Sequence, residues 1–384
     1  MIYNDFQGLK LSALGYGNMR LPTLESGGID LTEADKLIAY AYENGVNYFD
    51  TAYGYHGGES ESFIGKSLSR FPRDTWYLAS KFPGYQKRAT WNPAEVFAKQ
   101  LSRCGVEYFD FYLLHNVYES SFKTYTNPKF GIIDYLLEER RRGRIKRLGF
   151  SSHGGVPLLK EFLELYGSQM EFGMIEMNAL DWNLRNILEK YDLIGSFGIP
   201  LWVMEPVRGG RLASLPPESE AKLKSLRPTE SVAAWAFRWL ETFPKVTVVL
   251  SGMSKMAEVE DNLRTFAARK PLNETEKRVY EAVIGSLARI IECSGCRYCV
   301  QNCPKGLDIP TLIFLYNDCR FEPSTVAKMA VDAMKPSKRP NVCVKCGNCV
   351  EVCPQIIDIP SALKKFAAIL ETMPSFVPPA QEDD

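Results

Sequence analysis

The feature that most constrains the fold is an alternation of short apolar segments with longer segments of helical pattern. Eight segments rich in β-branched and aromatic residues are predicted strands, each followed by a predicted helix. They lie within residues 11–22, 46–49, 76–82, 109–115, 145–153, 173–178, 200–206 and 246–252. Strands that alternate with helices form right-handed βαβ units and a parallel sheet. Eight such units in about 270 residues predict an α/β fold of the (β/α)8 TIM barrel type.

An open, doubly wound sheet is the alternative for such an alternation. It predicts fewer strands and a glycine-rich loop that leads from the first strand into a helix. Here Gly15 and Gly17 follow the first strand, but no third glycine opens a helix, and Thr32 is the expected cap of the helix that comes next. The barrel is therefore favoured.

Cysteine spacing defines a second domain. Apart from Cys104, every cysteine lies between Cys293 and Cys353, where the pattern Cys-x-x-Cys-x-x-Cys-x-x-x-Cys-Pro occurs twice. Two structural zinc ions are the alternative, but zinc sites usually combine two separated pairs of ligands. Two 4Fe–4S clusters are favoured, with the fourth cysteine of each motif ligating the other cluster. The predicted metal ligands are Cys293, Cys296, Cys299 and Cys353 for one cluster, and Cys343, Cys346, Cys349 and Cys303 for the other.

These patterns predict three parts of the chain. Residues 1–272 are the expected barrel, 273–290 a connecting helix, and 291–384 a small, mainly helical, ferredoxin-like domain with two clusters. The connection has a helical pattern and is not a Gly/Ser tether, so we expect a semi-rigid link. Cys104 and Cys319 lie outside the two motifs and are expected to be packing thiols.

Composition excludes several classes of function. The chain has 46 basic and 46 acidic residues, so its formal net charge is zero, and nothing draws it to nucleic acid or to an anionic membrane. No run of about 18 or more apolar residues predicts a membrane span. The N-terminus lacks the basic and apolar regions of a signal peptide, so a cytoplasmic location is expected.

Polar side chains end three successive predicted strands. Asp50 ends the second strand, with Tyr55 on the loop that follows, Lys81 ends the third, and His115 ends the fourth. In a TIM barrel these ends meet at the face where chemistry occurs. A phenol normally titrates near about 10, and a Lys81 ammonium oriented by Asp50 is expected to lower that pKa. With His115 holding the substrate oxygen, the set predicts a proton donor to a carbonyl that becomes an alkoxide.

At this point the chain resembles the aldo/keto reductase family, over residues from about 8 to about 270. The resemblance is carried by Phe-Asp-Thr-Ala-x-x-Tyr at 49–55, Ala-Ser-Lys at 79–81 and Phe-Asp-Phe-Tyr-Leu-Leu-His at 109–115. It implies a carbonyl or alcohol substrate and NAD(P)(H) as cofactor. It also implies a catalytic tetrad of Asp50, Tyr55, Lys81 and His115.

The resemblance extends to the segment that contacts the adenine and its ribose phosphate. Val-Val-Leu-Ser-Gly-Met-Ser at 248–254 and the helix around 258–263 carry it. The implied cofactor contacts are Ser251, Gly252, Met253, Glu258 and Asn262, with Asn262 facing the adenine. The family's Lys and Arg for the 2′-phosphate of NADP fall on Gly252 and Glu258. Because Glu258 would repel that phosphate, NAD is favoured over NADP.

The nicotinamide half of the expected pocket departs from the family. The glutamine beneath the nicotinamide amide falls on Met174, and the stacking aromatic residue falls on Met204. Ser151 and Ser152 remain as expected hydroxyl partners. A different redox ligand in this half of the pocket is therefore an open alternative.

A flavin such as FMN is that alternative. Iron–sulfur clusters transfer single electrons, nicotinamide transfers a hydride, and a flavin does both. No flavin fingerprint is readable, but TIM barrels bind phosphates at the loops after strands seven and eight. Those loops contain Val207, Arg208 and Gly210, together with residues 251–252.

The sequence thus predicts an oxidoreductase that interconverts a carbonyl and an alcohol, with electrons relayed through two 4Fe–4S clusters. The expected partners are a small-molecule carbonyl or alcohol and an electron-carrier protein such as ferredoxin. One rival is a flavin-dependent reductase fed by the clusters. Another is a non-catalytic electron-transfer protein with a relic barrel, against which the intact tetrad argues, since a relic has no reason to keep four roles in register.

Overall fold

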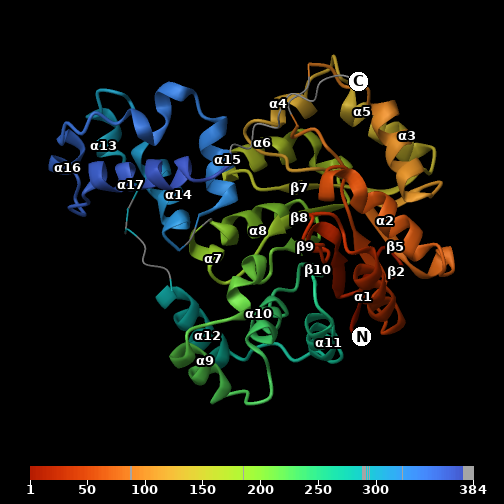
Figure 1. The fold of residues 1–384 in the computed structure, drawn as a ribbon. Coiled ribbons are helices and arrows are strands. Elements are labelled where there is room, and N and C mark those ends of the chain that lie inside the picture. Colours follow the sequence, from red (N-terminus) through yellow and green to blue (C-terminus); the bar gives the residue numbers. More distant parts are fainter. Residues whose placement is uncertain are drawn as a thin grey trace. The chain divides into compact units, whose positions relative to one another are not determined.

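The computed structural model describes residues 1–86, 89–184, 186–287, 291, 293, 295–321 and 323–374 (Figure 1). The chain divides into two compact units. One unit consists of Met1–Asp181 and Asn186–Tyr280, and the other of Trp182–Arg185 and Glu281–Asp384. Residues 288–290 of the expected connecting helix, and the tail from position 375, lie outside the described residues.

Within the described residues, eight parallel strands close into a barrel in the order β10-β3-β4-β5-β6-β7-β8-β9. Their bounds are β3 (Leu14–Gly17), β4 (Tyr48–Asp50), β5 (Tyr77–Phe82), β6 (Phe109–Leu114), β7 (Ile145–Ser152), β8 (Phe172–Glu176), β9 (Leu201–Met204) and β10 (Val246–Ser251). The prediction of a (β/α)8 barrel is confirmed. The strands are buried on both faces, which explains their continuous apolar runs.

Large side chains fill the barrel interior. Tyr48, Phe111, Phe172 and Trp202 are fully buried. The Phe111 ring lies 5.1 Å from the Tyr48 ring and 5.3 Å from the Phe172 ring, which in turn lies 4.7 Å from the Trp202 ring. Because the interior is packed, polar chemistry is confined to the ends of the strands.

An N-terminal hairpin, which the sequence patterns did not reveal, packs against one end of this interior. β1 (Tyr3–Phe6) pairs antiparallel with β2 (Leu9–Ser12). Phe6 is buried in the same apolar cluster as the barrel side chains, with its ring 5.0 Å from that of Trp202. The predicted first strand within 11–22 is thus two strands, the end of β2 and the whole of β3. The hairpin covers the end opposite to the carboxyl ends of the strands.

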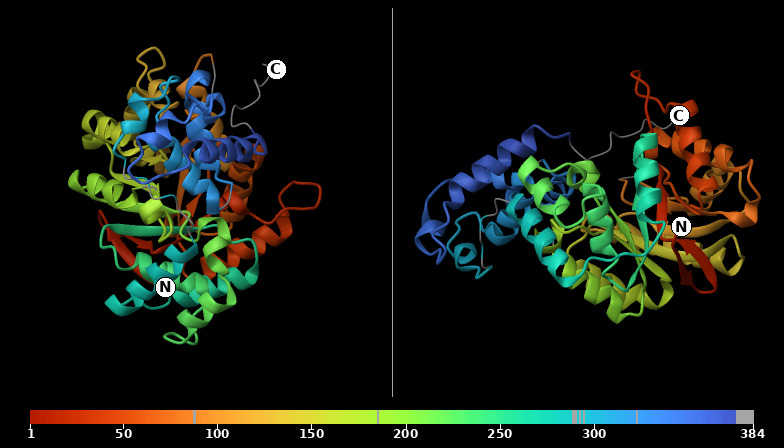
Figure 2. Two further views of the ribbon diagram at one scale, coloured as in Figure 1. Left: turned by 90° about the vertical axis from the view of Figure 1, so that its left-hand side faces the viewer. Right: turned by 90° about the horizontal axis from the view of Figure 1, so that it is seen from below.

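Helices surround the barrel, as Figures 1 and 2 show from three directions. Their bounds are α1 (Leu31–Glu43), α2 (Glu59–Leu68), α3 (Pro93–Cys104), α4 (Phe122–Tyr125), α5 (Ile132–Arg141), α6 (Val156–Tyr166), α7 (Asp181–Leu184), α8 (Ile187–Ser196), α9 (Pro217–Lys224), α10 (Val232–Leu240) and α11 (Met256–Thr265). The cap of α1 is Asp30, whose carboxylate accepts a hydrogen bond from the Glu33 N–H at 3.0 Å. The prediction that Thr32 caps this helix is wrong, because Thr32 already lies within the first helical turn.

The second unit is mainly helical. After α12 (Glu274–Leu287), it contains α13 (Tyr298–Gln301), α14 (Ile309–Phe321), α15 (Thr325–Ala333), α16 (Asn348–Glu351) and α17 (Ile359–Glu371). α14 and α17 pack together, with the Tyr316 ring 5.7 Å from the Phe366 ring. Cys299 and Cys349 belong to the same apolar core, so the cysteine loops and the helices form one body.

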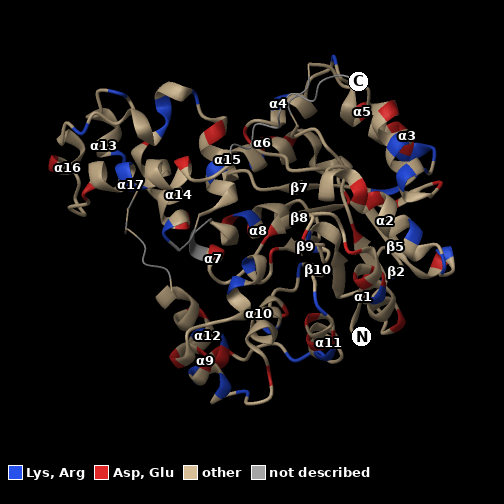
Figure 3. Ribbon diagram, in the orientation of Figure 1, with Lys and Arg blue, Asp and Glu red and all other residues tan. Residues whose placement is uncertain are grey.

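Charged residues of both signs are interspersed over the outer helices of the barrel, including α1, α2, α3 and α11, whereas the strands carry few of them (Figure 3). Among the described residues, no helix is long and apolar enough to cross a membrane.

Candidate functional site

Three strand ends and one loop bring the four expected catalytic residues together. Asp50 ends β4, Lys81 lies in β5, His115 follows β6, and Tyr55 opens the short helix Tyr55–Gly58 after β4. The Lys81 ammonium donates to the Asp50 carboxylate and, at 2.8 Å, to the Thr51 carbonyl. It also donates to the Tyr55 hydroxyl at 3.4 Å. The side chains of Lys81 and Asp50 are 1% and 4% exposed, so this ion pair is shielded from water.

Burial governs the protonation of this pair and of the phenol. It raises the pKa of Asp50 and lowers that of Lys81, and the attraction between the two opposes both shifts. Burial, followed by the charges of Asp50, Tyr85 and Glu205, holds the pKa of Tyr55 well above its ordinary value. Burial thus outweighs any lowering of this pKa by the neighbouring Lys81, and the net shift is upward. Tyr55 is therefore held as a neutral phenol.

His115 is buried against two tyrosine rings. Its ring lies 5.8 Å from that of Tyr55 and 4.8 Å from that of Tyr85, edge-on in both cases. The Tyr125 hydroxyl donates to the His115 carbonyl at 2.7 Å and fixes the backbone there. Burial, then the charges of Lys81 and His153, hold the pKa of His115 well below its ordinary value. A neutral imidazole keeps one N–H to donate.

A buried polar network supports β5 behind Lys81. The Gln100 amide on α3 donates to the Lys81 carbonyl at 3.1 Å and to the Glu61 carboxylate at 2.6 Å. The Ser80 hydroxyl donates to the same carboxylate at 2.7 Å. Because Glu61 and Gln100 are completely buried, the network ties α2 and α3 to the strand that carries the lysine. Satisfied buried networks of this kind rigidify a site.

Arginines gather at the ends of β9 and β10, where the sequence predicted phosphate contacts. Arg208 is buried and forms an ion pair with Asp181 at 3.2 Å. The Arg20 side chain lies close to both Gly209 and Gly252, since a Cβ atom at those positions would be 2.9 Å and 3.1 Å from it. These glycines therefore leave room for the arginine.

Arg211 completes this group of guanidinium ions. Its pKa is lowered by burial and then by the charges of Arg208 and Arg20, which shows that the three cations lie near one another. Sequence reasoning identified Arg208 but missed Arg20 and Arg211. Arg20 comes from the loop after β3, and only the closure of the barrel between β3 and β10 brings it there.

The glycine-rich loop after β9 turns through left-handed backbone conformations. Arg208 and Gly210 have φ values of 47° and 98°, and the Val207 carbonyl accepts from the Gly210 N–H at 3.0 Å. Gly210 is exposed, so its backbone is accessible to a ligand. Such nests of backbone N–H groups bind anions.

The residues expected around the adenine are partly engaged with one another. The Asn262 amide is buried and donates to the Ser251 hydroxyl at 3.0 Å. The Glu258 carboxylate accepts from the Ser254 N–H at 2.8 Å, which places its negative charge beside the start of α11. Gly252 is exposed, and the buried Met253 accepts from the Tyr16 hydroxyl through its carbonyl at 2.6 Å.

The residues expected to contact nicotinamide also make contacts within the barrel. The Ser151 hydroxyl accepts from the Asn116 N–H at 2.8 Å, and the Ser152 hydroxyl donates to the Val117 carbonyl at 2.7 Å. Both serines therefore fasten the loop after β6 to β7. Met174 is buried in the apolar cluster of the barrel, and Met204 packs against its edge.

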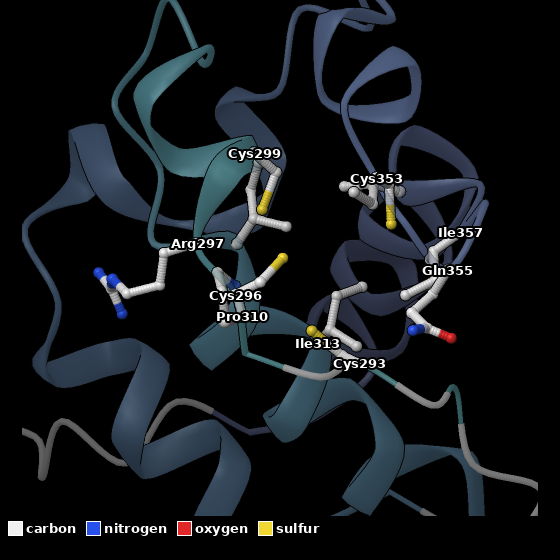
Figure 4. Close-up of a pocket in the computed structure, with 11 residues that line it drawn as sticks. Cys293, Cys296, Arg297, Cys299, Pro310, Ile313, Cys353, Gln355 and Ile357 are labelled. Carbon is white, nitrogen blue, oxygen red and sulfur yellow. The ribbon is translucent and has the colours of Figure 1, made fainter.

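In the second unit, the cysteines line two hollows. One is lined by Cys293, Cys296, Cys299 and Cys353, and Figure 4 shows their sulfur atoms directed into a common space bordered by Ile313 and Ile357. The other is lined by Cys303, Cys343, Cys346 and Cys349. Each hollow, counting space open to solvent, measures about 330 Å³. The grouping is the one assigned from the spacing, in which each fourth cysteine crosses to the other cluster.

The two hollows are adjacent, because Ile309 lines both. Four convergent thiols with apolar walls suit a 4Fe–4S cluster, whose potential depends on burial and solvent access. Cys319 is buried in the apolar core and lines neither hollow. Cys104 is buried at the end of α3.

Comparison with known families supports the division into these two domains. The model of the aldo/keto reductase family matches residues 13–281, and that of the 4Fe-4S dicluster domain matches residues 292–359. The chain belongs to the aldo/keto reductase family and carries a C-terminal 4Fe-4S dicluster domain. It is therefore an oxidoreductase.

Individual relatives resemble the barrel. A probable aldo-keto reductase of Glycine max is 30% identical over 153 residues, 38% of this chain and 42% of that protein. The uncharacterized oxidoreductase YqkF of Bacillus subtilis is 23% identical over 302 residues, 70% of this chain and 92% of that protein. The NADH-specific methylglyoxal reductase of Escherichia coli is 26% identical over 223 residues, 53% and 66% of the two chains. An aldo-keto reductase of Bacillus halodurans, in its holo form, superimposes with a TM-score of 0.57 at 29% identity, covering 72% of this chain and 93% of that one.

Proposed function

We propose that the barrel interconverts a carbonyl compound and the corresponding alcohol, with Tyr55 as proton donor and acceptor. The observation that carries this proposal is the contact of the Lys81 ammonium with both the Asp50 carboxylate and the Tyr55 hydroxyl, beside a neutral His115. These groups converge at the carboxyl ends of β4, β5 and β6, where TIM-barrel enzymes hold their substrates.

The residues divide the work as follows. In the reducing direction, His115 donates a hydrogen bond to the substrate oxygen, and Tyr55 transfers its proton to that oxygen as the carbonyl carbon is reduced. Lys81, 3.4 Å from the phenol oxygen, stabilises the phenolate that remains. Asp50 keeps the ammonium in place. The oxidation of an alcohol runs through the same contacts in reverse.

A bound nicotinamide supplies the hydride for this reaction, or accepts it in reverse. The positively charged guanidinium groups of Arg20, Arg208 and Arg211 lie near one another and would bind the cofactor phosphates. NAD is favoured over NADP because the Glu258 carboxylate is held beside Ser254, near the expected 2′-phosphate position. The NADH specificity named for the E. coli relative supports this choice.

We propose that the two clusters exchange single electrons with a carrier protein such as ferredoxin, and with the barrel cofactor if that cofactor is a flavin, which can take up electrons one at a time and pass them on as a pair. Support comes from the adjacency of the two hollows at Ile309, since neighbouring clusters can exchange electrons. The eight proposed thiolate ligands also suit the reducing cytoplasm. A flavin in the barrel is the second candidate, favoured by Met174 and Met204 at the two positions where the family contacts nicotinamide.

Two measurements test the proposal. Mass analysis of the small molecule extracted from anaerobically purified protein distinguishes NAD from FMN. Carbonyl reduction by Tyr55→Phe, with Tyr40→Phe on the outer helix α1 as the matched control, tests the proton donor. We expect kcat to fall by at least about 100-fold in Tyr55→Phe with cofactor affinity retained, and the control to be unchanged. Wild-type turnover in Tyr55→Phe would refute the role of the phenol.

A further inference from the structure

Three side chains that can ligate a metal end three neighbouring strands on the other side of the barrel mouth. His153 follows β7, Glu176 is the last residue of β8, and Glu205 follows β9. β8 lies between β7 and β9 and pairs with both, with Glu176 in register with Met204, the residue before Glu205. The closed sheet therefore places the three side chains side by side, and none of them belongs to the tetrad.

Their ligand atoms lie within reach of a single ion. One imidazole nitrogen and one oxygen from each carboxylate all lie within 4.8 Å of one another. His153 Nδ1 is 2.9 Å from a Glu176 oxygen. Two atoms bound to one zinc ion lie roughly 3.4 Å apart in a tetrahedron and up to about 4.2 Å apart on opposite sides, given bond lengths of about 2.1 Å. Small side-chain rotations would complete such a site.

The framework around these side chains is fixed. The Glu176 side chain is only 1% exposed and that of His153 16% exposed. The backbone of Glu205 has a left-handed φ of 54°, and its carbonyl accepts from the Asn178 amide at 3.1 Å. Asn178 also donates to Asp181 at 2.7 Å, so the turn that carries Glu205 is held from α7. A sparsely populated backbone conformation persists where the surroundings enforce it.

Electrostatic influence indicates that this group lies near the tetrad. Glu205 is one of the charges that raise the pKa of Tyr55, and His153 is one of those that lower the pKa of His115. The two sets of residues therefore share the mouth of the barrel, with the tetrad on β4–β6 and the three other side chains on β7–β9.

We propose that His153, Glu176 and Glu205 form a binding site for one divalent transition-metal ion, such as Mn²⁺ or Zn²⁺. One imidazole nitrogen with two carboxylate oxygens is a donor set suited to these ions, whereas Mg²⁺ and Ca²⁺ prefer oxygen ligands alone. An ion with three protein ligands keeps coordination positions open. An ion held there would have the chemistry to polarise a substrate oxygen near the tetrad, and only this consequence rests on the proposed function.

Titration of the full-length protein with Mn²⁺, followed by electron paramagnetic resonance of free Mn²⁺, tests this site without any turnover. Oxidised 4Fe–4S clusters carry no net spin and do not interfere. We expect one Mn²⁺ per chain, displaced by Zn²⁺. His153→Gln, Glu176→Gln and Glu205→Gln should each weaken binding by at least about tenfold. Glu260→Gln, an exposed carboxylate on α11, is the matched control and should bind like the wild type.

Two results would overturn the proposal. One is the absence of stoichiometric Mn²⁺ or Zn²⁺ binding in the wild-type protein, which would leave His153 and Glu176 as a hydrogen-bonded pair. The other is wild-type affinity in the three glutamine variants with iron content and circular dichroism unchanged. Glu205 is partly exposed, so we expect Glu205→Gln to fold. It therefore still tests the site if the variant at the buried position, Glu176→Gln, fails to fold.

Discussion

Replacing Lys81 by methionine tests the buried ion pair at the base of the tetrad. Methionine fills much of the volume of the lysine stem but carries no charge, so Asp50 loses the ammonium while its side chain stays 4% exposed. Removing one partner of a buried pair costs about 3–5 kcal/mol, because the remaining charge is uncompensated. We expect the free energy of unfolding of the Lys81→Met barrel to fall by that amount at neutral pH.

The pH dependence of this loss follows from Asp50. Burial already raises the pKa of that carboxyl, and removing Lys81 removes the attraction that opposed the shift. The folded variant then retains a proton that the unfolded chain releases near about pH 4. Its deficit should be small below pH ~4 and should grow by up to about 1.4 kcal/mol per pH unit, until the pH passes the folded-state pKa.

Urea unfolding at several pH values, monitored by fluorescence of the barrel tryptophans, measures both quantities. Trp202, Trp235 and Trp239 are all fully buried in the barrel unit and report its unfolding. Lys66→Met, an exposed lysine on α2, is the matched control and should change stability by less than about 0.5 kcal/mol. The double variant Asp50→Asn/Lys81→Met should recover much of the loss and remove the added pH dependence. A small, pH-independent effect of Lys81→Met alone would refute the reasoning.

Three further outcomes are expected. Cys296→Ser should lose about four of about eight irons per chain. Cys319→Ser, whose cysteine lies outside both hollows, is the control and should keep all its iron. Equal iron loss in the two variants would contradict the ligand assignment. Burial lowers the pKa of His115, so below about pH 6.5 the unfolded chain binds a proton that the folded chain does not. The free energy of unfolding should therefore decrease as the pH falls below that value, by up to about 1.4 kcal/mol per pH unit. His115→Asn should reduce that slope in urea unfolding, and an unchanged slope would exclude His115 as its source. Gly65→Ala should destabilise the barrel by at least about 1–3 kcal/mol in thermal unfolding, because the new Cβ would lie 2.0 Å from a backbone oxygen of α3. In Gly285→Ala the new Cβ meets no atom within 4 Å, so this control should be neutral or stabilising.

The barrel could be predicted from sequence because its strands are buried on both faces and end in polar residues. A parallel strand that is buried on both faces appears in the sequence as a continuous apolar run. Polar residues at the end of such a run, as with Asp50 and Lys81, indicate the carboxyl-end face of the barrel. The N-terminal hairpin was missed because Tyr3–Phe6 is short and only Phe6 in it is buried. Its role depends on contacts with residues more than a hundred positions away, which no local pattern contains.

The same limit applies to the site. Arg20 belongs to the first loop of the barrel, yet it lies against Gly252 of the last, so its role depends on closure of the sheet. The pKa of Tyr55 also required the structure, because the sequence shows a neighbouring lysine but not the extent of burial. By contrast, His153 and Glu205 lie at the ends of segments that the sequence predicted as strands, so the signal that located the tetrad was also present for them.

In the function proposed above, proton transfer and hydride or electron supply belong to different strands of the barrel mouth. The tetrad lies wholly on β4–β6 and their loops, whereas the positions that depart from the family, Met174 and Met204, lie on β8 and β9. A proton donor held by Asp50 and Lys81 serves a substrate oxygen whichever cofactor reduces the adjoining carbon. Changes on β8 and β9 can therefore alter the redox partner without disturbing the acid. Under the proposed function, this independence explains how the four expected catalytic residues can be kept while the positions expected to contact nicotinamide differ from the family, in a chain with a C-terminal 4Fe-4S dicluster domain.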